Sequence, residues 1–212
     1  MKSTTVNHVA STETLKTIFE RRAVRKYLPD IISDDILEKI IDAGRMAPSA
    51  MNGQPWRFYI VTHKDTIALF SREIAKITSK VVLKAAIKHP IKAIKALLHF
   101  SPGSIGLEGE DPIFHGAPVV IFITAPKDDE WAGLDIGMCA QNIMLAAKSL
   151  GLDSCPIGFA KYIEQTPVLH KLEVPRGEEV QLAIILGYGD EKPEQHPRLK
   201  NNAIFIDRME CC

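Results

Sequence analysis

Four cations stand within six residues in Arg21-Arg22-Ala23-Val24-Arg25-Lys26-Tyr27. This stretch follows residues 12–20, whose apolar side chains recur with the spacing of an amphipathic helix. Pro29 bars further helix, so the arginines are expected on a turn, where they can converge on one phosphate through charge-assisted hydrogen bonds. The alternative is a solvated basic helix end, which the helix dipole favours.

A second polar stretch follows about twenty residues later and reads Ala47-Pro48-Ser49-Ala50-Met51-Asn52-Gly53-Gln54-Pro55-Trp56. It places a hydroxyl, two carboxamides and rigid prolines in one short loop. Asn52 and Gln54 each offer both a donor and an acceptor, which suits the alternating N–H and C=O groups along the edge of a pyrimidine-like ring.

These two stretches resemble the FMN-binding signatures of the nitroreductase family, an Arg-Arg-x-x-Arg-x-aromatic motif followed by Pro-Ser-x-x-Asn-x-Gln-Pro-Trp. Later segments match further family motifs in the same order, so that the resemblance covers most of the chain. These segments are Phe114 to Val120 for an aromatic-x-x-Ala-Pro strand, Gln141 to Leu152 for the central helix and its turn, and Leu186 to Gly189 with Pro197-Arg198 for the closing motif.

The resemblance implies a flavin site built from three parts of the chain. The phosphate and ribityl contacts would come from Arg21, Arg22, Ala23, Arg25 and Arg198, with His196 close by. The partner subunit would contribute Pro48, Ser49, Ala50 and Asn52, supported by Gln54. Pro156, Ile157 and Gly158 would lie along the ring, with one backbone N–H facing N5.

Two departures from the family pattern concern the contacts of the nicotinamide and of flavin N1. Gly158 follows Ile157 where many relatives have an acid, and His196 stands where lysine is frequent. The family's lysine near N1 is not assigned, and Lys76 and Lys80 are its candidates.

The activity that the resemblance implies is the reduction of electron-poor acceptors such as nitroaromatics, quinones and enones by NADH or NADPH. FMN carries the chemistry in a ping-pong scheme, so no catalytic side chain and no metal are expected. The sequence has no GxGxxG, GxxxxGK[ST], HExxH or GxSxG motif. Three alternatives remain open: reductive dehalogenation, flavin fragmentation, and a non-catalytic flavin-binding module. A thiol nucleophile at Cys155, with His115 or His170 as base, lacks an activating context.

Composition limits the classes of partner. The 26 basic and 26 acidic residues cancel, so no global charge attracts nucleic acid. The N-terminus lacks the apolar core of a secretory signal, and the longest uncharged run, 112–126, is shorter than the ~18–20 apolar residues of a spanning helix. We therefore expect a cytoplasmic protein without a membrane span. Its four cysteines show no metal-ligand spacing and are expected as free thiols.

Periodicity predicts the secondary structure. Expected helices cover 12–20, 33–47, a short stretch from Lys64, 76–95 with a kink at His89-Pro90, and 131–150. Expected strands cover 58–62, 117–124, 152–159 and 180–189, and the tail offers an edge strand at 203–206. The fold class expected from the resemblance is α+β, with a central, mostly antiparallel sheet flanked by helices. The chain is expected to form one domain, 1–212, with an amphipathic helical insertion at about 76–110.

The insertion and the assembly raise separate questions. Lysines recur every three or four residues along 76–95, and this basic helix is interpreted as a solvated face, an active-site lid or a membrane-docking element. Helix 131–150 is apolar nearly all round, which indicates burial in the core or in a subunit interface. An intertwined homodimer is predicted from this helix, from the flavin contacts expected from a neighbouring subunit and from the long tail.

Overall fold

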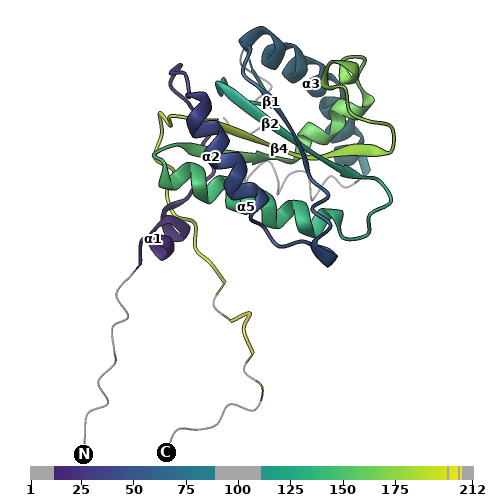
Figure 1. Ribbon diagram of the computed structural model, residues 1–212. Coiled ribbons are helices and arrows are strands. Elements are labelled where there is room, and N and C mark those ends of the chain that lie inside the picture. Colours follow the sequence, from purple (N-terminus) through teal and green to yellow (C-terminus); the bar gives the residue numbers. More distant parts are fainter. Residues whose placement is uncertain (1–11, 89–110, 200, 205, 207–212) are drawn as a thin grey trace, which may run out of the picture.

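The centre of the computed structural model is a four-stranded antiparallel sheet in the order β1-β2-β4-β3 (Figure 1). The structure describes residues 12–88, 111–199, 201–204 and 206. The strands are β1 Arg57–Val61, β2 Val119–Pro126, β3 Asp153–Ile157 and β4 Glu178–Gly187. The expected mixed fold around an antiparallel sheet is confirmed, with strand ends shifted by a few residues.

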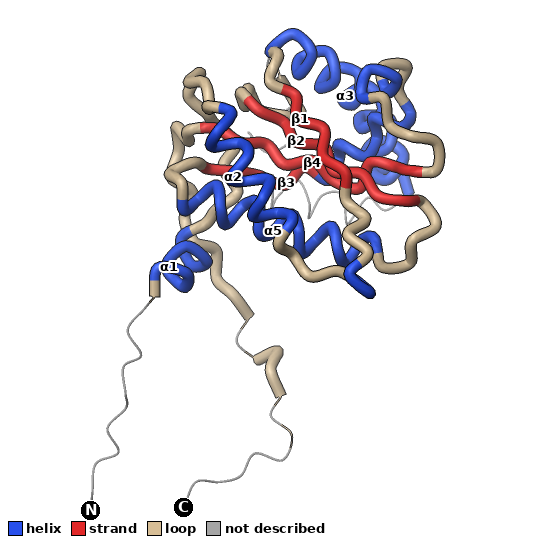
Figure 2. The backbone as a smooth tube through the Cα atoms, viewed as in Figure 1, coloured by secondary structure: helices blue, strands red, loops and turns tan. Residues whose placement is uncertain are grey.

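Helices cover both faces of this sheet (Figure 2). The α-helices are α1 Glu13–Glu20, α2 Asp34–Arg45, α3 Lys64–Lys88 and α5 Ala132–Ser149, and the 3-10 helices are η1 Ala50–Asn52, η2 Gly158–Gln165 and η3 Leu169–Leu172. Helices α2 and α5 share one hydrophobic core with the sheet, whereas α3, η2 and η3 share the other.

Strand β2 divides these two cores. The strand was expected at 117–124, and its continuous apolar run is of the kind that is covered on both faces. Seven of its eight residues are buried. Ile121 and Ile123 point toward α2 and α5, while Val120 and Phe122 point toward α3, because successive side chains of a strand alternate between faces. Phe122 makes edge contacts with two other rings on that side at 5.7 Å.

A glycine turn joins α5 to β3. Gly151 has φ 82°, a conformation that glycine adopts without steric cost. The Leu152 N–H donates to the Ala147 carbonyl at 2.9 Å and the Gly151 N–H to the Lys148 carbonyl at 3.2 Å, which completes a Schellman motif. Gly151 therefore ends α5, and β3 begins directly beside the C-terminal end of that helix.

Two expected elements differ from the structure. The short helix from Lys64 and the start of the basic helix form one continuous helix, α3, because no proline or glycine interrupts the stretch from Lys64 to Lys88. The expected kink at His89-Pro90 and residues 89–110 of the insertion lie outside the described residues. Residues 203 and 204 form no strand in this single chain.

The single-domain organisation, the insertion boundaries and the cytoplasmic location stay predictions. Among the described residues, no helix combines the length and the apolar composition needed to cross a bilayer.

The contact between α2 and α5 generates a stability prediction. A Cβ at Gly44 would lie 2.7 Å from Ile143 Cγ1 and 3.4 Å from Cys139 Sγ, and both neighbours are fully buried. Gly44→Ala should therefore lower the free energy of unfolding by about 1–2 kcal/mol, although alanine is the better helix former. Urea denaturation at fixed protein concentration measures the change. The exposed Lys39→Ala on the same helix is the control and should change it by less than about 0.5 kcal/mol. A Gly44→Ala protein as stable as the parent would contradict this packing.

Candidate functional site

The arginine segment is extended, and the predicted turn is wrong. After α1 ends, Ala23 pairs with Ser154 of β3 in a parallel bridge, and Tyr27 pairs with Gly189 beyond β4. The Val24 N–H donates to the Ser154 carbonyl at 3.1 Å, and the Leu28 N–H donates to the Tyr188 carbonyl at 2.8 Å. These backbone hydrogen bonds are the reason for the difference, because they satisfy groups that a turn would leave to solvent.

Arg21 of the extended segment is partly buried and experiences the charges of Arg22 and of Arg198 in the tail. Burial lowers the pKa of the Arg21 guanidinium, and the charges of Arg22 and Arg198 lower it further, against an opposite effect of Cys155. Within the described part of the chain, none of these arginines forms an ion pair with a carboxylate. That Arg21 and Arg198 bind one phosphate together stays a prediction.

Arg22 is directed toward the end of α1. Its Nη1 donates to the Phe19 carbonyl at 2.6 Å and to the Arg21 carbonyl at 2.8 Å, which satisfies carbonyls at the helix C-terminus. Its Nε is buried without a hydrogen-bond partner in the described structure. Arg25 and His196 are exposed, and the His196 carbonyl accepts from Arg198 Nη1 at 2.9 Å.

A phosphate fits this arrangement. Arg21 is partly buried and repelled by the charges of Arg22 and Arg198, and an anion beside it would relieve both the repulsion and the desolvation. The unpartnered Nε of Arg22 is a further donor next to Arg21. Guanidinium groups match phosphate oxygens in charge and in geometry.

Three acids that sequence reasoning did not select bond to the arginine segment or to the turn at residues 111–116. The Arg25 N–H donates to the Glu191 carboxylate, and the neighbouring Asp190 pairs with Lys26 at 3.0 Å. The Asp111 carboxylate accepts from the Phe114 N–H at 2.8 Å and the Gly116 N–H at 3.1 Å. The acid three residues before Phe114 is a sequence signal for such a turn, whereas the contact of Glu191 depends on chain pairing distant in sequence.

His115 lies inside the turn made by Asp111, with φ 57°. Burial lowers the pKa of its imidazole, and the charge of Arg25 acts in the same direction, against Asp111 and Glu191. Burial also raises the pKa of the Cys155 thiol, which works against a thiolate nucleophile at that position.

The loop between α2 and β1 adopts an unusual backbone. Met51, Asn52 and Gln54 have φ values of 50°, 56° and 46°, which are costly for residues with a side chain. The Gln54 N–H donates to Ser49 Oγ at 3.0 Å, and Gln54 Nε2 donates to Asn52 Oδ1 at 3.2 Å. Both carboxamides remain exposed and able to contact a ligand.

A buried carboxylate fixes this loop to the start of α5. Asp135 is only 2% exposed, and its two oxygens lie 3.2 and 3.1 Å from the Ala50 nitrogen, whose N–H they accept. A carboxylate buried this deeply needs a hydrogen-bond donor, and the Ala50 N–H supplies it. Because the hydrogen bond is buried and charge-assisted, it stabilises the strained backbone.

The third part of the expected site is the end of β3. Ile157 pairs with Ala183 of β4, and its side chain is buried in the core beside α3, so only its backbone is available to a ligand. Pro156 and Gly158 are exposed. A Cβ at Gly158 would meet nothing within 4 Å, which leaves open space where many relatives have an acid.

The two lysine candidates remain unassigned. Lys76 and Lys80 are exposed on α3, and Lys76 pairs with Glu73 at 2.5 Å. No described contact links either lysine to the arginine cluster.

The structure does not bring the loop and the arginines together within one chain. The loop is tied to Asp135 near the start of α5, whereas Ala23 lies beside Ser154, just after its end. From Asp135 to Lys148 the helix rises about 20 Å at ~1.5 Å per residue. Figure 1 shows α1 beside one end of α5 and the segment that follows α2 beside the other.

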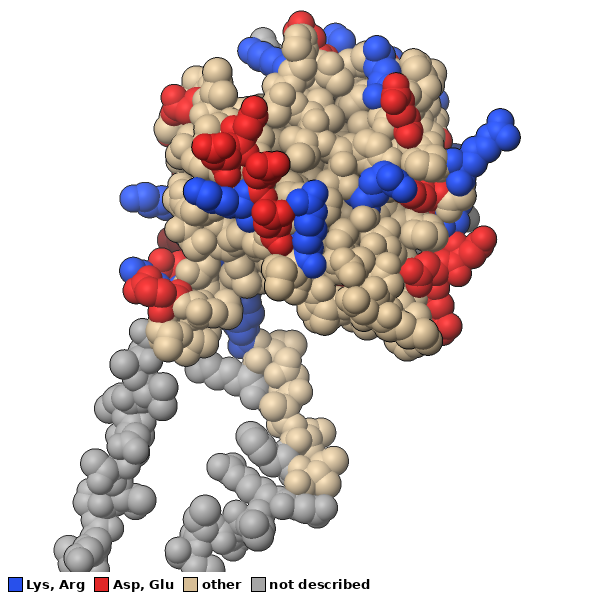
Figure 3. Space-filling model, in the orientation of Figure 1, with Lys and Arg blue, Asp and Glu red and all other residues tan. Residues whose placement is uncertain are grey.

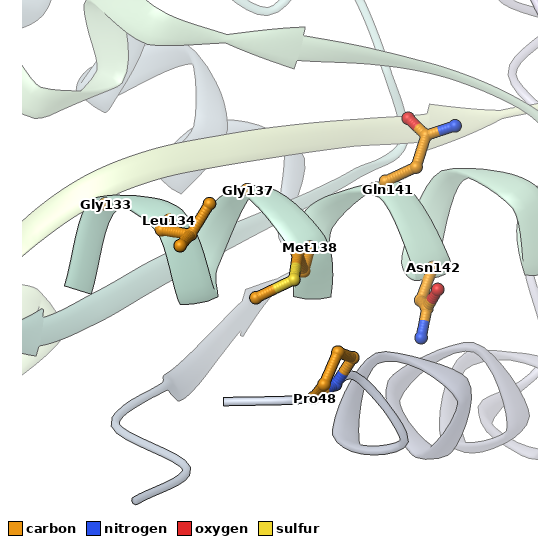
Figure 4. Close-up of a pocket in the computed structure, with 7 residues that line it drawn as sticks. All are labelled: Pro48, Gly133, Leu134, Gly137, Met138, Gln141 and Asn142. Atoms are coloured by element: carbon orange, nitrogen blue, oxygen red, sulfur yellow. The ribbon is translucent and has the colours of Figure 1, made fainter. Parts of the chain in front are cut away.

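The surface of α5 between these two regions is uncharged and hollowed. Pro48 and the outer side of α5 line an open depression of about 400 Å³ (Figure 4). Its other lining residues are Gly133, Leu134, Gly137, Met138, Gln141 and Asn142. Figure 3 shows the charged side chains of this face mainly over α2 and a broad uncharged area over α5. Helix α5 is therefore buried on one side only, and this fulfils only part of the predicted burial. On its outer side, Leu134 is 58% exposed.

Comparisons with known proteins agree with this geometry. The model of the nitroreductase family matches residues 18–188. The 4-nitrobenzoate reductase of Pseudomonas putida is 29% identical over 198 residues, which cover 82% of this chain and 84% of the relative. The nitrobenzene nitroreductase of Ectopseudomonas oleovorans is 29% identical over 225 residues, covering 91% of each chain.

Solved structures show the same fold. A nitroreductase with bound FMN from Desulfitobacterium hafniense superposes with a TM-score of 0.74 and 25% identity, covering 92% of this chain and 99% of that one. A nitroreductase with bound FMN from Bacteroides fragilis gives a TM-score of 0.69 and 27% identity, with 93% and 100% covered. The family match over residues 18–188, together with the shared fold, confirms the resemblance seen in the sequence: the chain belongs to the nitroreductase family.

Proposed function

We propose that this protein is an FMN-dependent oxidoreductase that uses NADH or NADPH to reduce electron-poor acceptors such as nitroaromatics, quinones and enones. The observation that carries the proposal is the partly buried Arg21, on which the charges of Arg22 and Arg198 act, while none of the three forms an ion pair with a carboxylate among the described residues. Relatives named as nitroreductases, and similar structures with bound FMN, support it.

The arginines bind the phosphate of the cofactor in this proposal. Arg21 and Arg198 supply charge and paired donors, Arg22 adds its positive charge, and Arg25 and His196 flank them. Ala23 leaves room beside the ribityl chain. Fixed cations need no reorganisation when the anion arrives, which favours tight binding.

The remaining residues orient the ring. The carboxamides of Asn52 and Gln54 offer donors and acceptors to its pyrimidine edge, while Pro48, Ser49 and Ala50 shape the loop. The backbone of Pro156, Ile157 and Gly158 runs along the ring, with one N–H directed to N5. When bound, FMN supplies the redox chemistry, accepting hydride from the nicotinamide and passing electrons to the acceptor in a ping-pong sequence.

Two copies of the chain form the complete site in this proposal. The loop and the arginines lie at opposite ends of α5, about 20 Å apart along the helix. A two-fold homodimer in which the apolar faces of α5 meet places the loop of one copy beside the arginines of the other. The uncharged, hollowed surface of α5 suits such a contact.

The activity itself is tested with purified, FMN-loaded protein. It should absorb as an oxidised flavoprotein and oxidise NADH or NADPH steadily only when a nitroaromatic or a quinone is present, with parallel lines in double-reciprocal plots. A non-catalytic flavin module would hold FMN without this turnover. Reductive loss of halide from a haloaromatic, or fragmentation of the flavin, in place of nitro or quinone reduction would instead reveal another flavin chemistry and refute the proposed acceptors.

Removal of one arginine tests the phosphate contact. Arg21→Ala should weaken FMN by about 1.5–3 kcal/mol, the value of a charge-assisted hydrogen bond, and should leave riboflavin affinity nearly unchanged. Isothermal titration of the apoprotein with each ligand measures the difference. Arg176→Ala, at an exposed position outside the cluster, is the control and should bind both ligands as the parent does. Equal losses for FMN and riboflavin would show that the phosphate lies elsewhere.

A further inference from the structure

The second half of α3 extends beyond the hydrophobic core. In its first half, Ile67, Phe70 and Ile74 are buried against the sheet, and Thr78 is the last of its described side chains that is buried. Beyond it, large apolar side chains point outward: Val82 is 43%, Leu83 63% and Ile87 74% exposed. A helix surface of this kind indicates a contact outside the chain's own core.

The same outer face carries cations. At 3.6 residues per turn, Leu83 and Ile87 fall between Arg72 and Lys80 around the helix axis, with Lys84 next to them. Arg72, Lys80 and Lys84 are exposed and form no ion pair with the described carboxylates. Only Lys76 is paired, with Glu73. The sequence has no further acid between Glu73 and Glu108, so the local charge is strongly positive.

The mixture of lysines and aliphatic side chains on this face favours one class of binding partner over another. The cores of protein–protein interfaces are depleted in lysine. A lipid surface accepts both kinds of group, because lysine stems extend along the apolar layer while their ammonium groups reach anionic headgroups. In addition, α3 lies on the face of the sheet opposite α5 (Figure 2), so the dimer contact proposed along α5 does not account for it.

We propose that the outer face of α3, formed by Arg72, Lys76, Lys80, Leu83, Lys84 and Ile87, docks the protein on an anionic lipid surface. The helix lies on this surface and does not span it, because none of the described helices has the apolar length needed to cross a bilayer. Binding combines partial burial of Leu83 and Ile87 with attraction of the cations to the headgroups, and therefore depends on both lipid charge and salt.

Co-sedimentation of the FMN-loaded full chain with lipid vesicles tests the proposal. The protein should bind vesicles of phosphatidylcholine mixed with phosphatidylserine, should not bind pure phosphatidylcholine, and should be released as salt is raised. Lys80→Glu with Lys84→Glu should reduce the partition coefficient on the order of 20-fold or more. Leu83→Ser with Ile87→Ser should reduce it by at least about tenfold.

Matched variants separate this site from overall charge. Lys39→Glu with Lys127→Glu makes the same charge change at exposed positions away from α3 and should retain binding. Equal loss in this control pair, equal binding to neutral vesicles, or no binding at all would overturn the proposal. A changed sedimentation coefficient of the Leu83 and Ile87 variant, with vesicle binding intact, would assign the face to a protein contact and overturn it as well. Because the substituted lysines are exposed, their variant folds and keeps the test decisive even if the serine variant does not fold.

Discussion

The buried hydrogen bonds between Asp135 and the Ala50 backbone fix the geometry on which the proposed site depends. They hold a loop with three positive φ values at the start of α5, while the tight turn at Gly151 delivers β3 and its arginine neighbours to the other end of that helix. A rigid helix thus sets the distance between two regions that are both expected to contact one cofactor. Their separation is a property of the single chain, and the proposed homodimer would bring the loop of one copy to the arginines of the other.

The charges of the arginines beside the C-terminal end of α5 explain the role proposed for this part of the site. Pairing of residues 23–28 with β3 and with the residues after β4 fixes the backbone, and the charge of Arg198 in the tail acts on Arg21. Clustering these cations costs free energy in the absence of an anion. Such a cost is typical of a binding site and not of a structural contact, because structural cations are generally paired. The acids nearby serve the backbone: Glu191 and Asp111 accept hydrogen bonds from main-chain N–H groups.

Local sequence signals predicted the elements that local physics determines. The apolar run of β2, the glycine that ends α5 and the polar loop from Pro48 to Gln54 were all visible as patterns. The extended path of the arginine segment was not, because it depends on pairing with Ser154, far away in the sequence. The role of Glu191 was hidden for the same reason. The break expected before Lys76 does not occur. The change in composition at that point does not end the helix, because residues with good helix propensity continue through it.

The most direct test of the shared site is a mixed dimer of two defective subunits, one carrying Arg21→Ala with Arg198→Ala and the other carrying Ser49→Ala with Asn52→Ala. Each variant alone should form a homodimer that binds FMN weakly. If each site takes its arginines from one copy and its loop from the other, the mixed dimer contains one site with both defects and one intact site. Titration should then find one FMN per mixed dimer with the affinity of the parent protein. A mixed dimer with no such site would contradict the account, because it would place the loop and the arginines of each site in the same chain.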